Sequence, residues 1–85
     1  MNRTQIERKV NLVLDDCLGI SFDKIDTNAL LNADLGVDSI DEVELVMELE
    51  RKFGIKIEDE EMQMGEDWTI GEVYDFVERK LNDKS

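Results

Sequence analysis

The chain has 85 residues, a length that fits one small domain, which we place at residues 1–85. Its formal net charge is -12, so it lacks the surplus of Lys and Arg that binding to nucleic acid or to an anionic membrane surface needs. Basic proteins and cations remain as the expected partners. No apolar run approaches the ~20 residues of a membrane span, and the first residues carry no apolar signal stretch, so we expect a cytoplasmic protein.

The acidic residues are unevenly distributed along the chain. Residues 34 to 67 hold thirteen Asp and Glu against Arg51, Lys52 and Lys56, which leaves a local net charge of -10. The rest of the chain is close to neutral. Because apolar residues recur at helical spacing, we expect a folded protein in which this acid marks one surface, not a disordered chain.

A first helix is predicted near the start of the chain. Thr4 and Glu7 form a capping box, in which each side chain can satisfy a free backbone N–H of the other residue. Apolar residues then recur at a spacing of three and four, at Ile6, Val10, Val13, Leu14 and Cys17. The helix should end at about Leu18, because Gly19 follows.

Residues 19–37 show no clear period and make a long connection. Leu30, Leu31 and Leu35 should fold this connection onto the core. A second helix is predicted from an N-cap at Asp38, with Asp41 three residues on completing the cap, through Phe53 to a stop at Gly54.

The last predicted helix starts at Thr69, which forms a capping box with Glu72, while Trp68 and Val73 are spaced as a hydrophobic staple. Its apolar face consists of Ile70, Val73, Tyr74, Phe76, Val77 and Leu81. A short helical turn is predicted from Asp59 to Met62, and no segment alternates convincingly as a strand. We therefore predict an all-α four-helix bundle with three main helices and one short helix.

The second predicted helix has two apolar faces. At roughly 100° per residue, one stripe contains Leu45, Val46, Leu49 and Phe53, and the other contains Ile40, Val43 and Met47. Both stripes cannot face the same small core. The second stripe is bordered by Asp41, Glu44 and Glu48, which is typical of an exposed docking surface. The alternative is a helix shared between two packed neighbours, with Val43 partly buried.

Ser39 follows the N-cap of this helix and is the candidate site of chemistry. A serine nucleophile needs a base such as His within hydrogen-bond reach, and the sequence contains no His. Hydrolysis by the chain itself is therefore not expected. Ser39 is better placed to accept a group from another enzyme, because a phosphate there would meet the positive end of the helix dipole.

The many acidic residues raise the alternative of calcium binding. An EF-hand loop beginning at Asp34 would need an oxygen ligand in place of Gly36, glycine in place of Ser39 and Glu in place of Leu45, and all three requirements fail. The absence of His and the single Cys17 exclude a disulfide within the chain and a zinc site. No dedicated metal site is predicted.

The sequence also resembles a known family. The resemblance is carried by Asp34-Leu35-Gly36-Val37-Asp38-Ser39-Ile40-Asp41 and Val43-Glu44-Leu45-Val46-Met47, with further matches at Leu49-Glu50, Phe53, Ile57, Asp59-Glu60-Glu61 and Thr69-Ile70-Gly71-Glu72-Val73. Over these residues the chain resembles the acyl carrier proteins of fatty acid synthesis. The likeness is close over about half of the chain and loose over the remainder.

The resemblance implies a carrier that is not itself an enzyme. A phosphopantetheinyl transferase, using coenzyme A and Mg²⁺, would attach a 4′-phosphopantetheine arm to Ser39, beside Asp38. Acyl groups would travel as thioesters on this arm among fatty acid synthase enzymes that carry basic docking patches. The implied fold is a monomeric four-helix bundle that can hide the acyl chain between its helices. The residues that the resemblance assigns to docking are Asp38, Ile40, Asp41, Glu44, Met47 and Glu50.

The chain departs from the family pattern in three places. The usual Leu after the serine is Ile40 here. Where many fatty acid carriers have a second Glu after Glu50, this chain has Arg51, followed by Lys52, which shortens the acidic strip at its far end. Glu58 replaces a family proline.

Two other functions remain open alternatives. A carrier of a polyketide, nonribosomal peptide or D-alanyl pathway would share the same serine and differ in its cargo. A non-carrier protein that binds partners or buffers calcium through its acid is the other alternative. The dense acid on the second predicted helix favours the fatty acid pathway.

Overall fold

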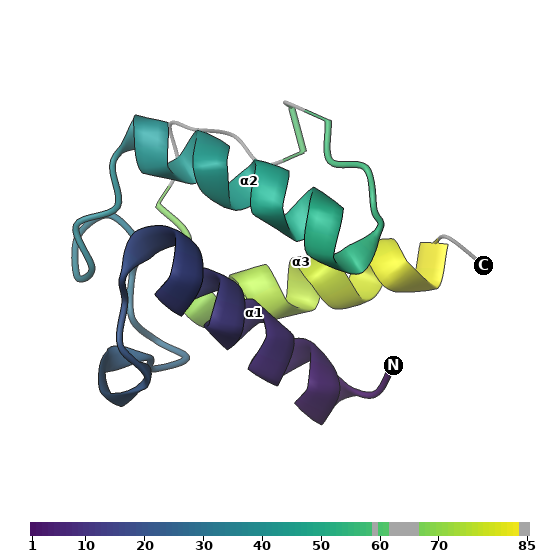
Figure 1. The fold of residues 1–85 in the computed structure, drawn as a ribbon, viewed down its shortest axis with the longest axis horizontal. Coiled ribbons are helices and arrows are strands. Elements are labelled where there is room, and N and C mark those ends of the chain that lie inside the picture. Colours follow the sequence, from purple (N-terminus) through teal and green to yellow (C-terminus); the bar gives the residue numbers. More distant parts are fainter. Residues whose placement is uncertain (59, 62–66, 84–85) are drawn as a thin grey trace.

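The computed structural model describes residues 1–58, 60–61 and 67–83, and Figure 1 shows their arrangement. Within this part of the chain the only β-type pairing is an isolated bridge between Leu30 and Thr69. The helices, in chain order, are α1 (Arg3–Leu18), the 3-10 helix η1 (Phe22–Lys24), α2 (Ser39–Phe53) and α3 (Ile70–Asp83). The predicted all-α fold with three main helices is confirmed.

The two short helical segments differ from the prediction. η1 lies in the connection where no helix is predicted. The short helix predicted from Asp59 to Met62 lies largely outside the described residues. Glu60 and Glu61 are described and lie in a turn, in which the Glu61 N–H donates to the Glu58 carbonyl (3.0 Å). The fourth helix therefore stays a prediction.

The start of α1 corrects the predicted cap at Thr4 and Glu7. The N-cap is Asn2, whose Oδ1 accepts the Gln5 N–H (2.8 Å), while Gln5 Oε1 accepts the Asn2 N–H (2.9 Å). Asn caps a helix at least as well as Thr, and Gln closes a capping box as Glu does, so the helix begins two residues earlier. Gly19 ends the helix with φ 68°, as predicted.

The predicted ends of α2 and the predicted start of α3 are confirmed. Gly54 follows α2 with φ 64°, a left-handed conformation that costs glycine little. At the start of α3, the Thr69 N–H donates to Glu72 Oε1 (2.9 Å) and the Glu72 N–H donates to Thr69 Oγ1 (3.1 Å).

The core lies between the helices and is closed by residues from their connections. α1 packs against both α2 and α3, and the loop between α1 and α2 lies at the opposite end of the molecule from both termini (Figure 1). The buried apolar side chains are Ile6, Val10, Val13 and Leu14 of α1, Leu45, Leu49 and Phe53 of α2, Ile70, Val73, Tyr74, Phe76 and Val77 of α3, and Ile20, Leu31, Val37, Ile55 and Ile57 of the connections.

Four further residues that were predicted to face the core are wholly or partly buried. Leu31 is fully buried as predicted, and Leu35, Cys17 and Leu81 pack partly buried against the core. Trp68 places its ring edge-on to Phe76, with 5.5 Å between ring centroids. Its predicted staple contact with Val73 stays a prediction.

The connection between α1 and α2 is held against the start of α3 by backbone hydrogen bonds. They run from the Leu31 N–H to the Trp68 carbonyl (2.8 Å), from the Ile70 N–H to the Ala29 carbonyl (3.0 Å) and from the Gly71 N–H to the Thr27 carbonyl (2.9 Å). The last two of these bonds satisfy free N–H groups of the first turn of α3, which would otherwise lack partners. The loop is therefore an integral layer of the fold.

Gly71 is the point of closest approach between this connection and α3. A Cβ atom at this position would lie 2.6 Å from Thr27 Cγ2 and 3.2 Å from the Thr27 carbonyl oxygen. Only glycine lets the two segments approach closely enough for the Gly71–Thr27 hydrogen bond.

We predict that Gly71→Ala lowers the free energy of unfolding by about 1–3 kcal/mol, because the added methyl group overpacks this contact. Urea denaturation followed by circular dichroism measures the loss. Adding Thr27→Ala removes the nearest clashing atom and should recover part of the lost stability. A Gly71→Ala variant as stable as the wild type would contradict the close approach.

Candidate functional site

Ser39 is the first residue of α2, and the end of the preceding connection fixes its position. Val37 is buried, and its N–H donates to the Leu31 carbonyl (2.8 Å). The Asn32 side-chain amide donates to the Val37 carbonyl (2.8 Å). The backbone N–H and the carbonyl of Val37 are therefore both held by hydrogen bonds, two residues before the serine.

Asp38 orients the first turn of α2. Its Oδ1 accepts the Asp41 N–H (2.8 Å), and Asp41 Oδ2 receives the Asp38 N–H at a longer 3.4 Å, so the predicted capping box is confirmed. Both carboxylates act on backbone groups and neither is positioned as a base for the serine. The structure thus assigns Asp38 a positioning role at the predicted attachment site.

The Ser39 side chain is exposed on this rigid turn. Within the described residues, no hydrogen bond occupies its hydroxyl group. The free N–H groups and the dipole at the start of α2 favour a negatively charged group next to it. The arrangement suits an acceptor of a phosphate ester that another enzyme adds.

The outer face of α2 presents the predicted apolar stripe. Ile40 is 70% exposed, Val43 48% and Met47 60%, whereas Leu45 and Leu49 on the other face are fully buried. The exposed stripe is confirmed, and the alternative of a helix packed on both sides is wrong for these residues. Glu44 is exposed beside the stripe, and Asp41 is half-buried at its start.

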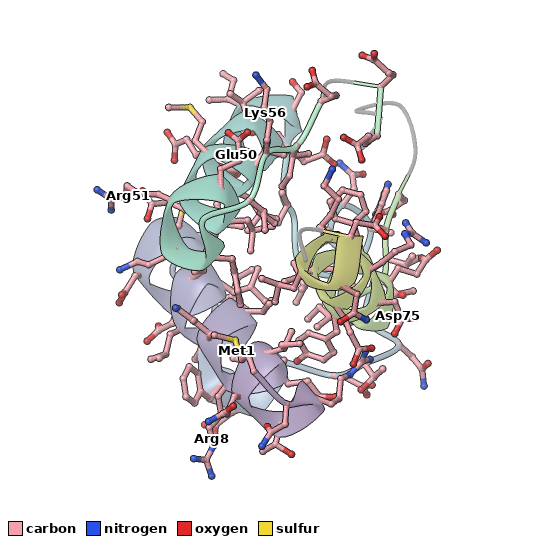
Figure 2. All side chains as sticks on the ribbon, turned by 90° about the vertical axis from the view of Figure 1, so that its right-hand side faces the viewer. Met1, Arg8, Glu50, Arg51, Lys56 and Asp75 are labelled. Atoms are coloured by element: carbon pink, nitrogen blue, oxygen red, sulfur yellow. The ribbon has the colours of Figure 1, made fainter. Side chains whose placement is uncertain are left out.

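Glu50, also predicted to dock partners, has a second role. Its Oε2 accepts the Ile57 N–H (2.9 Å), which holds the segment after α2 against the helix. Figure 2 shows Glu50 beside that segment and Arg51 pointing away from the molecule. Arg51 pairs with Glu48 (3.1 Å). One carboxylate oxygen of Glu50 is therefore engaged within the fold.

Glu42 is a feature of the site that the sequence analysis missed. It is only 7% exposed, the one charged residue among the buried residues that the structure describes. Burial raises the pKa of the Glu42 carboxyl, and the nearby negative charges of Asp67 and Asp38 raise this pKa further. The signal was present in the spacing, because residue 42 continues the core-facing stripe of residues 45, 46, 49 and 53.

The described part of the chain contains neither a cluster of metal-binding side chains nor a membrane-spanning helix. There, no group of three or more His, Cys, Asp or Glu side chains is arranged to hold a metal ion. None of the helices in these residues is long and apolar enough to cross a membrane.

Comparison with known proteins identifies the family of the chain. A family described as "Phosphopantetheine attachment site" matches residues 8–77, which include Ser39 and all of α2. The chain belongs to this family. Its prosthetic group is 4′-phosphopantetheine, held covalently, and its role is that of an acyl carrier.

Curated relatives and a solved structure agree with this assignment. The acyl carrier protein of Thermosynechococcus vestitus is 38% identical over 81 residues, covering 95% of this chain and 98% of the relative. The acyl carrier protein of Thermotoga maritima is 35% identical over 80 residues, covering 94% and 96%. A crystal structure of an acyl carrier protein from Thermotoga maritima superposes with a TM-score of 0.80 at 29% identity, covering 100% of this chain and 96% of that one.

The carrier's residues fit this prosthetic group. The exposed hydroxyl of Ser39 could form a phosphodiester bond, and the free N–H groups at the start of α2 would stabilise the phosphate charge. The group supplies a flexible arm with a terminal thiol that carries acyl groups as thioesters.

Proposed function

We propose that this chain carries acyl intermediates of fatty acid biosynthesis as thioesters on a phosphopantetheine arm attached to Ser39. The observation that supports it most directly is the exposed Ser39 on the first turn of α2, inside the capping box of Asp38 and Asp41 and inside the stretch that matches the family. In this role the chain is a cytoplasmic monomer that delivers acyl groups to enzymes and has no catalytic activity of its own.

Attachment requires a phosphopantetheinyl transferase with coenzyme A and Mg²⁺. The Ser39 oxygen forms a phosphodiester bond to the phosphopantetheine half of coenzyme A, its proton leaves, and the adenosine nucleotide half is the leaving group. Asp38 keeps the first turn of α2 formed, so the hydroxyl enters the transferase from a fixed position. No base from this chain is needed, because the transferase supplies the catalytic groups.

The exposed face of α2 supports docking to basic enzymes of the pathway. Ile40 and Met47 offer apolar contact area, and Asp41 and Glu44 border them with negative charge. A negative rim attracts partners with basic patches and speeds their encounter, while the apolar residues hold the complex. The density of acid along α2 favours fatty acid enzymes as these partners.

The attachment site is tested by incubating the protein with a transferase, coenzyme A and Mg²⁺ and measuring its mass. We predict that the wild type gains one arm and that Ser39→Ala gains none while keeping its helical circular dichroism. Ser21→Ala is the matched control, because Ser21 is also an exposed serine that precedes a helical turn. An arm on Ser39→Ala would show that the site is wrong.

Docking is tested by the kinetics of acyl transfer with a fatty acid ketosynthase at two salt concentrations. Glu44→Lys should lower kcat/KM about 10-fold at low salt, and the defect should shrink at high salt because rim charges act mainly on encounter. Met47→Ala removes apolar contact, so its defect should persist in salt.

The control for docking is Asp15→Lys, which makes the same change of charge on the exposed side of α1. It should leave transfer nearly unchanged. Equal defects in Asp15→Lys and Glu44→Lys would mean that net charge alone governs encounter. A large loss of thermal stability in Met47→Ala would contradict the exposed position of that side chain.

A further inference from the structure

A cavity lies where the end of α1 meets the last part of the connection that leads to α2. Its volume is about 410 Å³, within the range of about 300–1,000 Å³ that is usual for small-molecule sites. Two segments that are far apart in the sequence form its walls. The residues that line it are Leu18, Gly19, Ile20 and Ser21 on one side and Asp34 and Leu35 on the other. The attachment site and the exposed face of α2 consist of other residues.

Backbone hydrogen bonds hold both walls of this cavity in place. On the side of α1, the Ile20 N–H donates to the Leu14 carbonyl (3.2 Å). On the side of the connection, the Leu35 N–H donates to the Leu30 carbonyl (3.1 Å). The cavity is therefore preformed, so a ligand that enters it does not have to order the two segments first.

The lining combines apolar side chains with one free acceptor. Ile20 is buried, and Leu18 and Leu35 are half-buried, so these side chains offer apolar surface to a ligand. The Asp34 carboxylate is held by the Leu30 N–H, which donates to its Oδ2 (2.8 Å). Within the described residues, nothing donates to the other oxygen, Oδ1. This lining suits a slender, uncharged ligand with alkyl groups and an N–H or O–H donor, whereas the Asp34 charge would repel an anion.

The pantetheine part of the arm has this chemistry, because between its phosphate and its thiol it contains a dimethyl carbon, a hydroxyl group and two amide groups. Its attachment point is within reach of the cavity. Ser39 is four residues after Leu35, so the Cα atoms of these residues are at most about 14 Å apart. The arm has roughly as many backbone atoms as four to five residues, which gives it a reach of about 15 Å. The end of α1 and the start of α2 also lie at the same end of the molecule (Figure 1).

We propose that this cavity, between the end of α1 and residues 34–35, is a resting site for the uncharged pantetheine part of the arm. Leu18 and Leu35 contact its methyl groups, and Asp34 Oδ1 accepts a hydrogen bond from an amide or the hydroxyl group. This inference rests on the proposed function, because it requires an arm on Ser39. It adds to that function a surface of the carrier itself, from which an enzyme has to draw the thiol.

Covalent attachment makes a weak affinity sufficient for such a site. A ligand tethered by a short flexible linker has an effective concentration in the millimolar range. A cavity that binds free pantetheine with a dissociation constant of about 1 mM would therefore be filled about half of the time or more. An enzyme that binds the arm more tightly can still remove it.

The test is nuclear magnetic resonance spectroscopy of the full chain with the arm in place and its thiol free. Nuclear Overhauser contacts should join the methyl groups of the arm to those of Leu18 and Leu35. The amide signals of Gly19 and Ile20, which are remote from Ser39 in the sequence, should shift on attachment. Free pantetheine, added to the unmodified protein, should shift the same two signals in a saturable way at millimolar concentrations.

A variant at the edge of the cavity separates this site from other contacts of the arm. Ser21 is exposed, and its side chain makes no capping hydrogen bond, so it can be replaced without loss of such a bond. Ser21→Trp fills the cavity with a large side chain, and it should accept the arm but lose the contacts with Leu18 and Leu35. Ser21→Ala leaves the cavity open and is the matched control, which should keep these contacts.

Three results would contradict the proposal in different ways. An arm on Ser39 that makes no contact with Leu18 or Leu35 would overturn this inference and leave the carrier function intact. Contacts that persist unchanged in Ser21→Trp would show that the arm does not rest in this cavity. A wild-type protein that accepts no arm from the transferase would overturn the carrier function and this inference together.

Discussion

The position of Ser39 depends on the backbone hydrogen bonds that hold the connection between α1 and α2 against the start of α3. Residues 27–31 of that connection pair with residues 68–71, and the carboxylate of Asp67 binds two further N–H groups of the connection. These bonds place Leu31 and Val37 in the core, and Val37 is two residues before Ser39. A long segment without helical period thereby becomes a rigid support for the first turn of α2.

The ion pairs of the described residues leave part of the acidic surface of α2 unpaired. Arg3 gathers three carboxylates around it, those of Glu7 (2.8 Å), Asp75 (2.8 Å) and Glu78 (2.9 Å), and so links α1 to α3. Lys80 of α3 pairs with Glu61, which lies in the connection between α2 and α3 (2.9 Å). Exposed pairs of this kind add little stability. The cations that form them, Arg3 and Lys80, belong to α1 and α3 and not to α2. Beside the Ile40 stripe, Glu48 pairs with Arg51, whereas Asp41 and Glu44 form no ion pair within the described residues.

Most of the fold and the exposed position of Ser39 at the start of α2 could be predicted from the sequence, because helix caps and apolar spacing are local signals. The helix ends at Asp38, Gly54 and Thr69 each depend on hydrogen bonds between groups that are at most four residues apart in the sequence. The cap of α1 was misplaced, since the spacings of Asn2 with Gln5 and of Thr4 with Glu7 both suit a capping box, and the structure forms the first. The hydrogen bond from the Ile57 N–H to Glu50 joins residues seven apart in the sequence. No sequence period indicates such a contact, so it could not be predicted.

We propose above all that a covalent arm on Ser39 carries acyl cargo in the cell. Tandem mass spectrometry of the intact protein, purified from the cells that produce it, tests this most directly, since fragmentation locates the added mass on the chain. The account predicts phosphopantetheine on the fragment that contains Ser39, with acyl thioesters on part of the population. Protein that carries no arm, or an arm on any other residue, would contradict it.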